Sequence, residues 1–264
     1  MTGVALTWLG QAGFLLRGGG ATVLIDAFLS NVDSRLVPPP LDATTLSDVD
    51  LVLCTHEHWD HLDGPTVTAV AKASPGARVV VPAPITDQAV AAGVPANRVV
   101  GAVAYEPLTG LAVPVTPVPA CHGVDVADAY NFGQERSGGL VRYLGYVLEL
   151  AGVRVYHAGD TIWWPDQERV LRELGVHVAL LPINGRDPSR EADNIVGNLD
   201  HREAALLAAA AGVELLVPMH WDMFAANRGF PDQLVAVIER LGLEVPALVP
   251  RIMRPFQFLP AGAG

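Results

Sequence analysis

Apolar residues in this chain recur in short runs that are bounded by glycine, proline and polar turns. Residues 4–16 are mostly apolar, three glycines follow at residues 18–20, and a second apolar run occupies residues 21–26. This pattern predicts a β-hairpin or meander at the start of the chain. The wholly apolar run LVLC, residues 51–54, is typical of a strand buried on both faces of an α/β sheet.

Strands and helices are expected to alternate in the rest of the chain. The further predicted strands are residues 78–81, 99–103, 111–118, 140–150, 153–157, 178–181 and 214–217. The predicted helices are residues 65–73, 85–92, 167–174, 200–211 and 231–241. Asp200 and Glu203 resemble a capping box at the start of the fourth helix. A meander followed by strand–helix alternation occurs twice without a linker, which predicts two similar halves in a single domain, residues 1–264.

The composition is that of a globular protein, since half of the residues are hydrophobic and 264 residues suffice for one large α/β domain. A net charge of −11 argues against nucleic acid and anionic membranes as partners. Two cysteines cannot form a disulfide framework, and the apolar stretch at residues 204–213 is too short to cross a bilayer. The N-terminus lacks the layout of a signal peptide. We therefore expect a cytoplasmic protein without a membrane partner, with a homo-oligomer left open.

The segment THEHWDHLDG, directly after the LVLC run, carries the clearest chemical signal. In an extended chain, side chains alternate, so His56 and His58 point the same way. If the chain turns into a helix near Asp60, then Asp60 and His61 face a neighbouring direction. One turn can thus offer two pairs of ligands, and imidazole with carboxylate suits ions such as zinc, manganese or iron.

Two ligands per ion are too few, so other parts of the chain must contribute. His122, Asp160 and His220 each follow a short apolar strand. Loops at strand ends, held by a rigid sheet, are the usual place for a functional site. These three residues are the candidates to complete the ligand set.

The order of these motifs resembles that of the metallo-β-lactamase-fold superfamily. The chain has Asp26 at the end of an early strand, then HxHxDH, a later His, an Asp in GDT and a final His, over residues 26–220. Two further segments, residues 180–204 and 217–229, are similar to the branch of UlaG-type L-ascorbate-6-phosphate lactonases.

This resemblance implies a four-layer αββα sandwich with the site at one edge, between two sheets. It implies that Asp26 orients a ligand and that two divalent ions, zinc or manganese, are bound. The implied ligands are His56, His58 and His122 for the first ion, Asp60, His61 and His220 for the second, and Asp160 as the bridge.

The function expected from such a site is that of an enzyme, a metal-dependent hydrolase. Two ions bridged by Asp160 would share a water and lower its pKa to about 7. The resulting hydroxide would attack a lactone or ester of a small metabolite, phosphorylated metabolites included, and Asp60 would transfer a proton. Two alternatives stay open: a phosphodiesterase or phospholipase with the same dimetal site, and a metal-binding protein that is not an enzyme.

Substrate contacts are expected from the same loops. Asn184 and Arg186 lie in a strand-end loop, and Asp222 follows His220 by two residues. Arg136 and Arg142 flank a polar, glycine-rich stretch, residues 122–139, and are candidates to recognise an anionic group.

Overall fold

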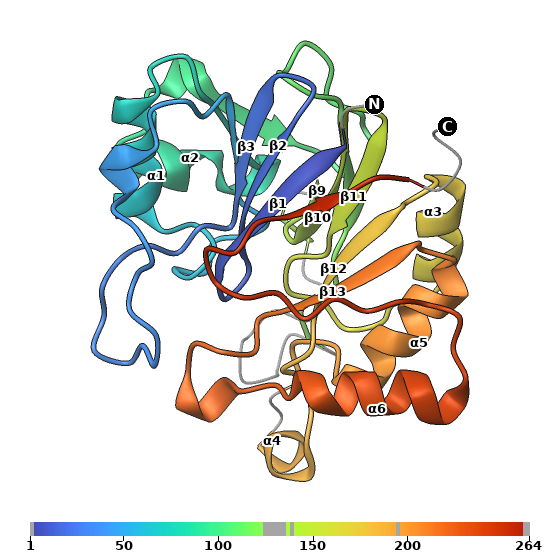
Figure 1. Ribbon diagram of the computed structural model, residues 1–264. Helices are drawn as coiled ribbons and strands as arrows, with labels where there is room; N and C mark the ends of the chain where they lie inside the picture. The colour runs from blue at the N-terminus through green and yellow to red at the C-terminus, as the bar shows by residue number, and fades with distance from the viewer. Residues whose placement is uncertain (1–2, 124–135, 138–139, 194–195, 261–264) are drawn as a thin grey trace.

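Two β-sheets lie face to face in the computed structural model, which describes residues 3–123, 136–137, 140–193 and 196–260 (Figure 1). The first sheet has seven strands in the order β14-β1-β2-β3-β4-β5-β6. Its strands are β1 (Val4–Gly10), β2 (Gly13–Gly18), β3 (Ala21–Ile25), β4 (Leu51–Leu53), β5 (Arg78–Pro82), β6 (Val99–Ala102) and β14 (Phe256–Phe258).

The second sheet has five strands in the order β13-β12-β11-β10-β7. Its strands are β7 (Val115–Pro119), β10 (Leu144–Leu150), β11 (Val153–His157), β12 (Val178–Pro182) and β13 (Leu215–Met219). A separate small ladder pairs β8 (Arg136–Ser137) with β9 (Leu140–Val141).

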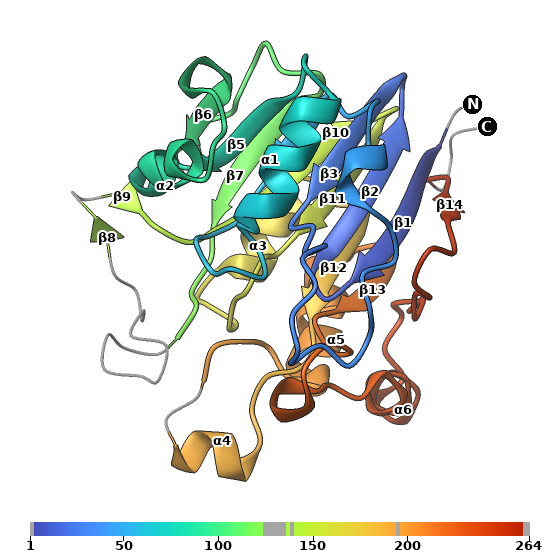
Figure 2. The same cartoon turned by 90° about the vertical axis from the view of Figure 1, so that its left-hand side faces the viewer.

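Helices cover the outer faces of both sheets. In Figure 2, α1 and α2 lie in front of the first sheet, whereas α5 packs on β12 and β13 of the second sheet and contacts α3 and α6. The α-helices are α1 (Gly64–Ala73), α2 (Thr86–Ala91), α3 (Gln167–Glu173), α4 (Pro188–Ala192), α5 (His201–Ala211) and α6 (Pro231–Leu241). The four-layer αββα sandwich predicted from the sequence is therefore confirmed. The single-domain boundary stays a prediction.

The alternation of side chains along β4 shows how the layers are held together. Leu51 and Leu53 are buried in the apolar core between the two sheets. Val52, which points to the opposite face, packs in a second core with Val67 and Val70 of α1. The LVLC run is therefore buried on both faces, as predicted, because its strand lies between a helix layer and a sheet.

Each sheet is antiparallel at one end and parallel at the other. In the first sheet β1, β2 and β3 form an antiparallel meander, and β3, β4, β5 and β6 are parallel. In the second sheet β7, β10 and β11 are antiparallel, and β11, β12 and β13 are parallel. This common plan fits the two similar halves.

The capping box of α5 is also present, with Asp200 and Glu203 bonded to each other's backbone nitrogens.

The structure corrects the predicted elements in several places. The strand predicted at residues 140–150 is interrupted after β9, and the one predicted at 111–118 begins only at Val115. Three short elements, β8, β14 and α4, were not predicted. β14 has three residues and exists because it pairs with β1, a long-range contact that local pattern does not encode. The polar stretch lies largely outside the described residues, at positions 124–135 and 138–139.

The loops after β3 and β12 reach the same, lower end of the molecule in both ribbon views (Figures 1 and 2). No helix in the described ranges is long and apolar enough to span a membrane.

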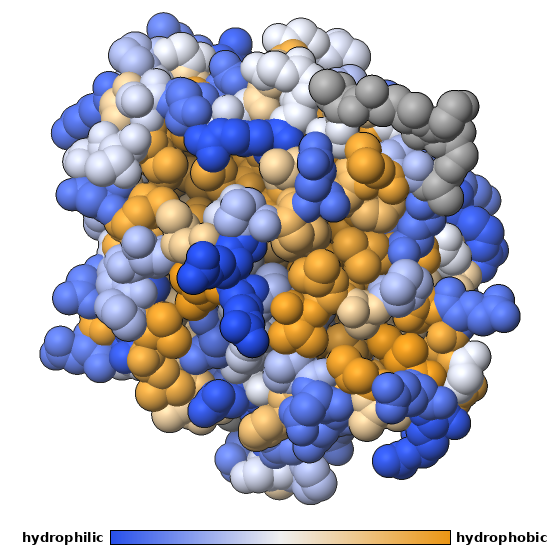
Figure 3. Space-filling model, in the orientation of Figure 1, coloured by the Kyte–Doolittle hydropathy of each residue, from blue (hydrophilic) through white to orange (hydrophobic). Residues whose placement is uncertain are grey.

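Figure 3 shows a broad apolar area on the right of one face, the side on which the C-terminal part of the chain lies in Figure 1. The large apolar side chains exposed from residue 230 onward are Phe230, Val235, Leu241, Val249, Met253 and Leu259.

Candidate metal centre

Loops at the ends of four strands bring the predicted ligands together. The histidine motif follows β4, His122 follows β7, Asp160 follows β11 and His220 follows β13. All seven predicted ligands fall into two groups, in each of which the candidate ligand atoms lie within 4.8 Å of one another. The first group is His56, His58, His122 and Asp160, and the second is Asp60, His61 and His220.

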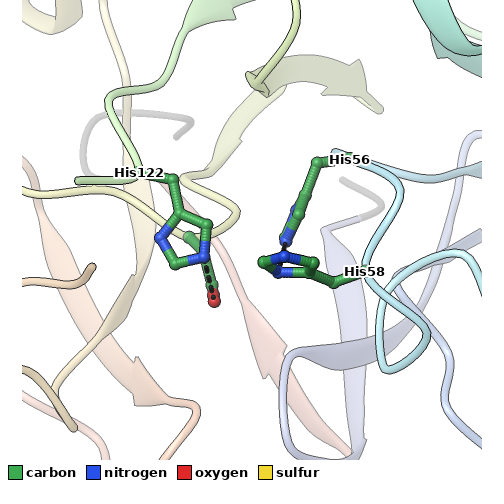
Figure 4. A group of neighbouring side chains, drawn as sticks. His56, His58 and His122 are labelled. Atoms are coloured by element: carbon green, nitrogen blue, oxygen red, sulfur yellow. Dashed lines mark hydrogen bonds and ion pairs between the residues drawn. The ribbon is translucent and has the colours of Figure 1, made fainter. Parts of the chain in front are cut away.

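In the first group, imidazole rings from two loops face a common point (Figure 4). His56 Nε2 and His58 Nδ1 lie 2.8 Å apart. His122 Nε2 lies 3.5 Å from Oδ2 of Asp160. The His122 ring is oriented from behind, because its Nδ1 donates a hydrogen bond of 2.6 Å to the carbonyl oxygen of Gly197. The three rings therefore present nitrogen atoms at the spacing of ligands that share one ion.

In the second group, the other oxygen of Asp160 completes the set. Its Oδ1 lies 3.3 Å from His61 Nε2 and 3.2 Å from His220 Nε2. Asp60 Oδ2 lies 3.5 Å from His220 Nε2 and 3.8 Å from His61 Nε2. Ligands at about 2.1 Å from a tetrahedral ion are about 3.4 Å from one another, so these separations fit one metal ion.

Two buried atoms in this group support the fit further. His61 Nε2 and Asp160 Oδ1 make no hydrogen bond within the described part of the chain. Leaving buried polar atoms unsatisfied costs about 1–3 kcal/mol each, and a cation between them would satisfy both. Asp160 thus offers one carboxylate oxygen to each group, the arrangement of a bridging ligand.

The electrostatics of the first group favour neutral imidazoles, the form that binds metals. Burial, with the neighbouring His61 and His58, lowers the pKa of His56 well below its usual value. Burial and the charge of His122 lower the pKa of His58 to about 3. Burial also lowers the pKa of His122. These nitrogens therefore need not lose a proton to bind a cation.

The second group behaves differently, because carboxylates surround its histidines. Burial lowers the pKa of His220, but the charges of Asp160 and Asp60 outweigh it and raise that pKa to about 9. Asp160, Asp26 and Asp60 likewise raise the pKa of His61 well above its usual value, against the effect of burial. In the absence of an ion, protons on His61 and His220 therefore balance the negative charge of these carboxylates. A bound metal ion would displace those protons.

Asp26 lies directly behind His61. Its Oδ2 accepts hydrogen bonds from His61 Nδ1, at 2.7 Å, and from the hydroxyl of Thr55, at 2.6 Å. Its Oδ1 accepts one from the backbone nitrogen of Thr55, at 2.8 Å. A hydrogen on His61 Nδ1 leaves the lone pair of Nε2 directed at the second group. The position of Asp26 therefore matches the orienting role that the resemblance implies.

Close packing of two loops allows this arrangement. Gly159, before Asp160, has a φ of +62°, and a Cβ at this position would lie 2.8 Å from Cβ of Thr55. Only glycine lets the loops after β4 and β11 approach so closely. Asp26 and His220 also have positive φ values, 44° and 58°. Such conformations cost about 1–2 kcal/mol in non-glycine residues and concentrate at functional sites.

Gln11, in the turn between β1 and β2, was not singled out from the sequence. It is 1% exposed and has a φ of 52°. Its side-chain nitrogen donates a hydrogen bond of 2.8 Å to Asp60 Oδ2 and lies 3.0 Å from His220 Nε2. Its backbone oxygen accepts a hydrogen bond from the backbone nitrogen of His220. The sequence offered one signal for Gln11: a polar residue between Gly10 and Gly13 in an otherwise apolar hairpin.

The predicted substrate contacts have other partners. Asp222 Oδ1 accepts a hydrogen bond from the backbone nitrogen of Gln11, and burial raises its pKa. Asn184 is 2% exposed and donates a hydrogen bond to Asn227. Arg186 forms an ion pair with Glu203. None of these three belongs to the two ligand groups, although Asp222 is linked to them through Gln11.

The fold and the order of the motifs define the class of protein. The family model of the beta-lactamase superfamily domain matches residues 21–221. The chain therefore belongs to the beta-lactamase superfamily, as the resemblance predicted.

Relatives within this superfamily narrow the class. A protein of Aeropyrum pernix named UPF0173 metal-dependent hydrolase is 33% identical over 95% of this chain and 94% of its own length. A protein of Rubrobacter xylanophilus with the same name is 32% identical over 96% of this chain and 95% of its own length. The chain belongs to this family of metal-dependent hydrolases. Its likeness to the UlaG-type branch stays a prediction.

Solved structures agree with this assignment. The metallo hydrolase Igni18 of Ignicoccus hospitalis is 25% identical and superimposes with a TM-score of 0.72, over 98% of this chain and 99% of that one. An isothiocyanate hydrolase from Delia radicum gut bacteria is 19% identical, with a TM-score of 0.75 over 96% and 98%. At that identity, the second likeness shows the fold alone.

Proposed function

We propose that the protein binds two divalent ions, zinc or manganese, and hydrolyses a lactone or ester of a small molecule in the cytoplasm. The observation that carries this proposal is the position of Asp160, which presents one carboxylate oxygen to each ligand group. Neither Cys54 nor Cys121 forms a disulfide, and both are buried, which suits a reducing compartment.

The geometry of the two groups supports the ligand assignment that the resemblance implies. Asp160 would bridge the ions. The first ion would be held by His56, His58 and His122, and the second by Asp60, His61 and His220. Bound at such a pair of positions, divalent ions supply an acidified water and polarise the attacked carbonyl.

Asp60 is the residue best placed to move a proton. Its side chain is 13% exposed, whereas that of Asp160 is 5% exposed. Burial raises the pKa of Asp60, but the charge of His61 and the hydrogen bond of His220 outweigh it and keep that pKa below its usual value. An ionised Asp60 can accept a proton from water and pass it to the leaving oxygen.

The reaction balances without a further reactant. The oxygen of water forms a bond to the carbonyl carbon, the acyl–oxygen bond breaks, and a proton reaches the departing alkoxide. A lactone would thus become a hydroxy acid.

The test combines metal analysis with a substrate panel. The purified protein should contain two divalent ions per chain and should open lactones faster than it cleaves bis(p-nitrophenyl) phosphate. His58→Ala and Asp160→Ala should lose this activity while keeping the far-ultraviolet circular dichroism of the folded chain. Undiminished turnover in either variant would refute the proposal, and preferred cleavage of the phosphodiester would support the alternative chemistry.

A further inference from the structure

Three aromatic residues pack together beside the candidate metal centre, and we call them the aromatic cluster: Phe28, Trp59 and Phe224. The ring centres of Phe28 and Trp59 are 5.0 Å apart with planes at 81°, and those of Trp59 and Phe224 are 5.4 Å apart at 63°. The ring centres of Phe28 and Phe224 are 6.2 Å apart. The two edge-to-face contacts of Trp59 and the tilted contact between the phenylalanines fix the rings relative to one another.

Each ring of the cluster comes from a loop that also carries a residue of the site. Phe28 follows Asp26 by two residues, Trp59 lies between His58 and Asp60, and Phe224 follows His220 by four residues. The loops are joined directly as well. The backbone nitrogen of Leu36 donates a hydrogen bond of 2.8 Å to the carbonyl oxygen of Met223, and Arg35 forms a β-bridge with Phe224. The aromatic cluster is therefore held at the border of the ligand groups.

The exposure within the cluster is unequal. Phe28 is 2% exposed, whereas Trp59 is 53% exposed, although its chain neighbours include two of the predicted ligands. A single exposed aromatic ring is ordinary on a protein surface. Here, however, two other rings position the exposed indole, and Trp59 lies between two predicted ligands, His58 and Asp60, in the chain. A preorganised apolar wall next to a few polar groups is typical of small-molecule binding sites.

Arginines near the site already have partners, although Nη2 of Arg35 is buried without a hydrogen bond in the described part of the chain. Arg35 donates hydrogen bonds to the carbonyl oxygens of Phe28, Ser30 and Val37. Arg142, which was a candidate for binding an anionic group, forms an ion pair with Glu57.

Arg186 is likewise paired, with Glu203. Lys72 lies in the last turn of α1. Along the helix axis it is about 12 Å from Gly64, the first residue of α1, which follows the histidine motif. An anionic substrate group would have to compete with these existing partners, whereas an apolar group would meet an exposed ring.

From this arrangement we propose that the substrate carries an uncharged apolar group, aromatic or aliphatic, next to its scissile lactone or ester bond. Trp59 contacts this group, and Phe224 and Phe28 hold the indole in place. The proposal rests on the hydrolase function above and specifies its substrate class.

The first test compares two lactones that differ only in an apolar group, γ-butyrolactone and γ-phenyl-γ-butyrolactone. The wild-type protein should have the larger kcat/KM for the phenyl compound. In Trp59→Ala the ratio of the two kcat/KM values should fall about tenfold, chiefly through KM for the phenyl compound. Tyr105→Ala is the matched control, because Tyr105 is also 53% exposed and lies in the loop after β6. It should leave the ratio unchanged.

The second test measures binding without hydrolysis. The protein as purified is titrated calorimetrically with 2-phenyltetrahydrofuran and with tetrahydrofuran, which lack the scissile bond. The phenyl compound should bind more tightly, and Trp59→Ala should weaken its binding about tenfold while Tyr105→Ala does not. If Trp59→Ala does not fold, both tests are repeated with Phe224→Ala, which removes a ring of the same cluster from a different loop.

The outcomes separate this inference from the proposed function. Trp59-dependent binding of the phenyl ether without hydrolysis of any lactone would refute the hydrolase proposal and leave the apolar site standing. Equal binding of the two ethers, or equal affinity in wild type and Trp59→Ala, would overturn the apolar site even if lactones are hydrolysed. A preference for a phosphorylated lactone over its phenyl counterpart would also overturn it.

Discussion

The substitution Asp26→Asn tests how the second ligand group is oriented. Asparagine has nearly the shape of aspartate, but only one of its two side-chain atoms accepts hydrogen bonds. Asp26 uses both oxygens, one for the backbone nitrogen of Thr55 and one for its hydroxyl and for His61 Nδ1. If the amide nitrogen faces His61, the hydrogen of that ring moves to Nε2, and the lone pair directed at the second group is lost.

The magnitude follows from the contact that is lost. A hydrogen bond to a charged group contributes about 1.5–3 kcal/mol, and 1.4 kcal/mol corresponds to about a factor of ten. Asp26→Asn should therefore weaken metal binding at the second group roughly 10–100-fold, as is typical for residues that orient a ligand. The first group, whose histidines do not contact Asp26, should keep its affinity.

The assay is a titration with zinc in competition with a chromophoric chelator, which resolves two dissociation constants. Asp63→Asn is the matched control, because Asp63 is also a buried carboxylate but accepts hydrogen bonds from Leu29, Ser30 and Thr66. Unchanged affinity at both sites in Asp26→Asn would refute the orienting role. An equal loss in Asp63→Asn would show that any buried carboxylate in this region has the same effect.

Three further predictions concern the same site. Gln11→Ala removes the side-chain amide that donates a hydrogen bond to Asp60, and it should weaken metal binding at the second group about tenfold in the same chelator titration. Unchanged affinity would mean that Gln11 stabilises only the turn between β1 and β2. Because the pKa of His220 is raised to about 9 in the absence of an ion, this histidine is protonated at pH 7, so metal binding should release a proton and should strengthen as the pH rises towards 9. Calorimetry in buffers of different ionisation enthalpy measures that release, and an identical heat in every buffer would contradict it. Removal of metal by a chelator should abolish hydrolysis, and zinc or manganese should restore it; activity that survives complete removal would contradict metal dependence.

The parts of the fold that depend on local pattern were accessible from the sequence. The apolar LVLC run predicted a strand buried on both faces, and the structure confirms this in the positions of Leu51, Val52 and Leu53. β14 was not accessible in the same way, because three residues carry too little periodicity and the strand forms only by pairing with β1 across the whole chain.

For the candidate site, too, some residues could be predicted from the sequence and others could not. Residue type and spacing indicated seven candidate ligands, and the structure brings them into two groups. Gln11 could not be inferred from a motif, because its role depends on a positive φ and on a turn that meets the loop of His220 in space. The ion pairs of Arg142 and Arg186 were also hidden, since the sequence does not reveal which carboxylate reaches each guanidinium.

A crystal structure of the protein loaded with zinc, with anomalous diffraction recorded at the zinc edge, tests the central claim most directly. We predict two anomalous peaks about 3.5–4 Å apart, one in each ligand group, with one oxygen of Asp160 bound to each ion. A single peak, two peaks that do not share Asp160, or peaks away from His56, His61 and His220 would contradict the account.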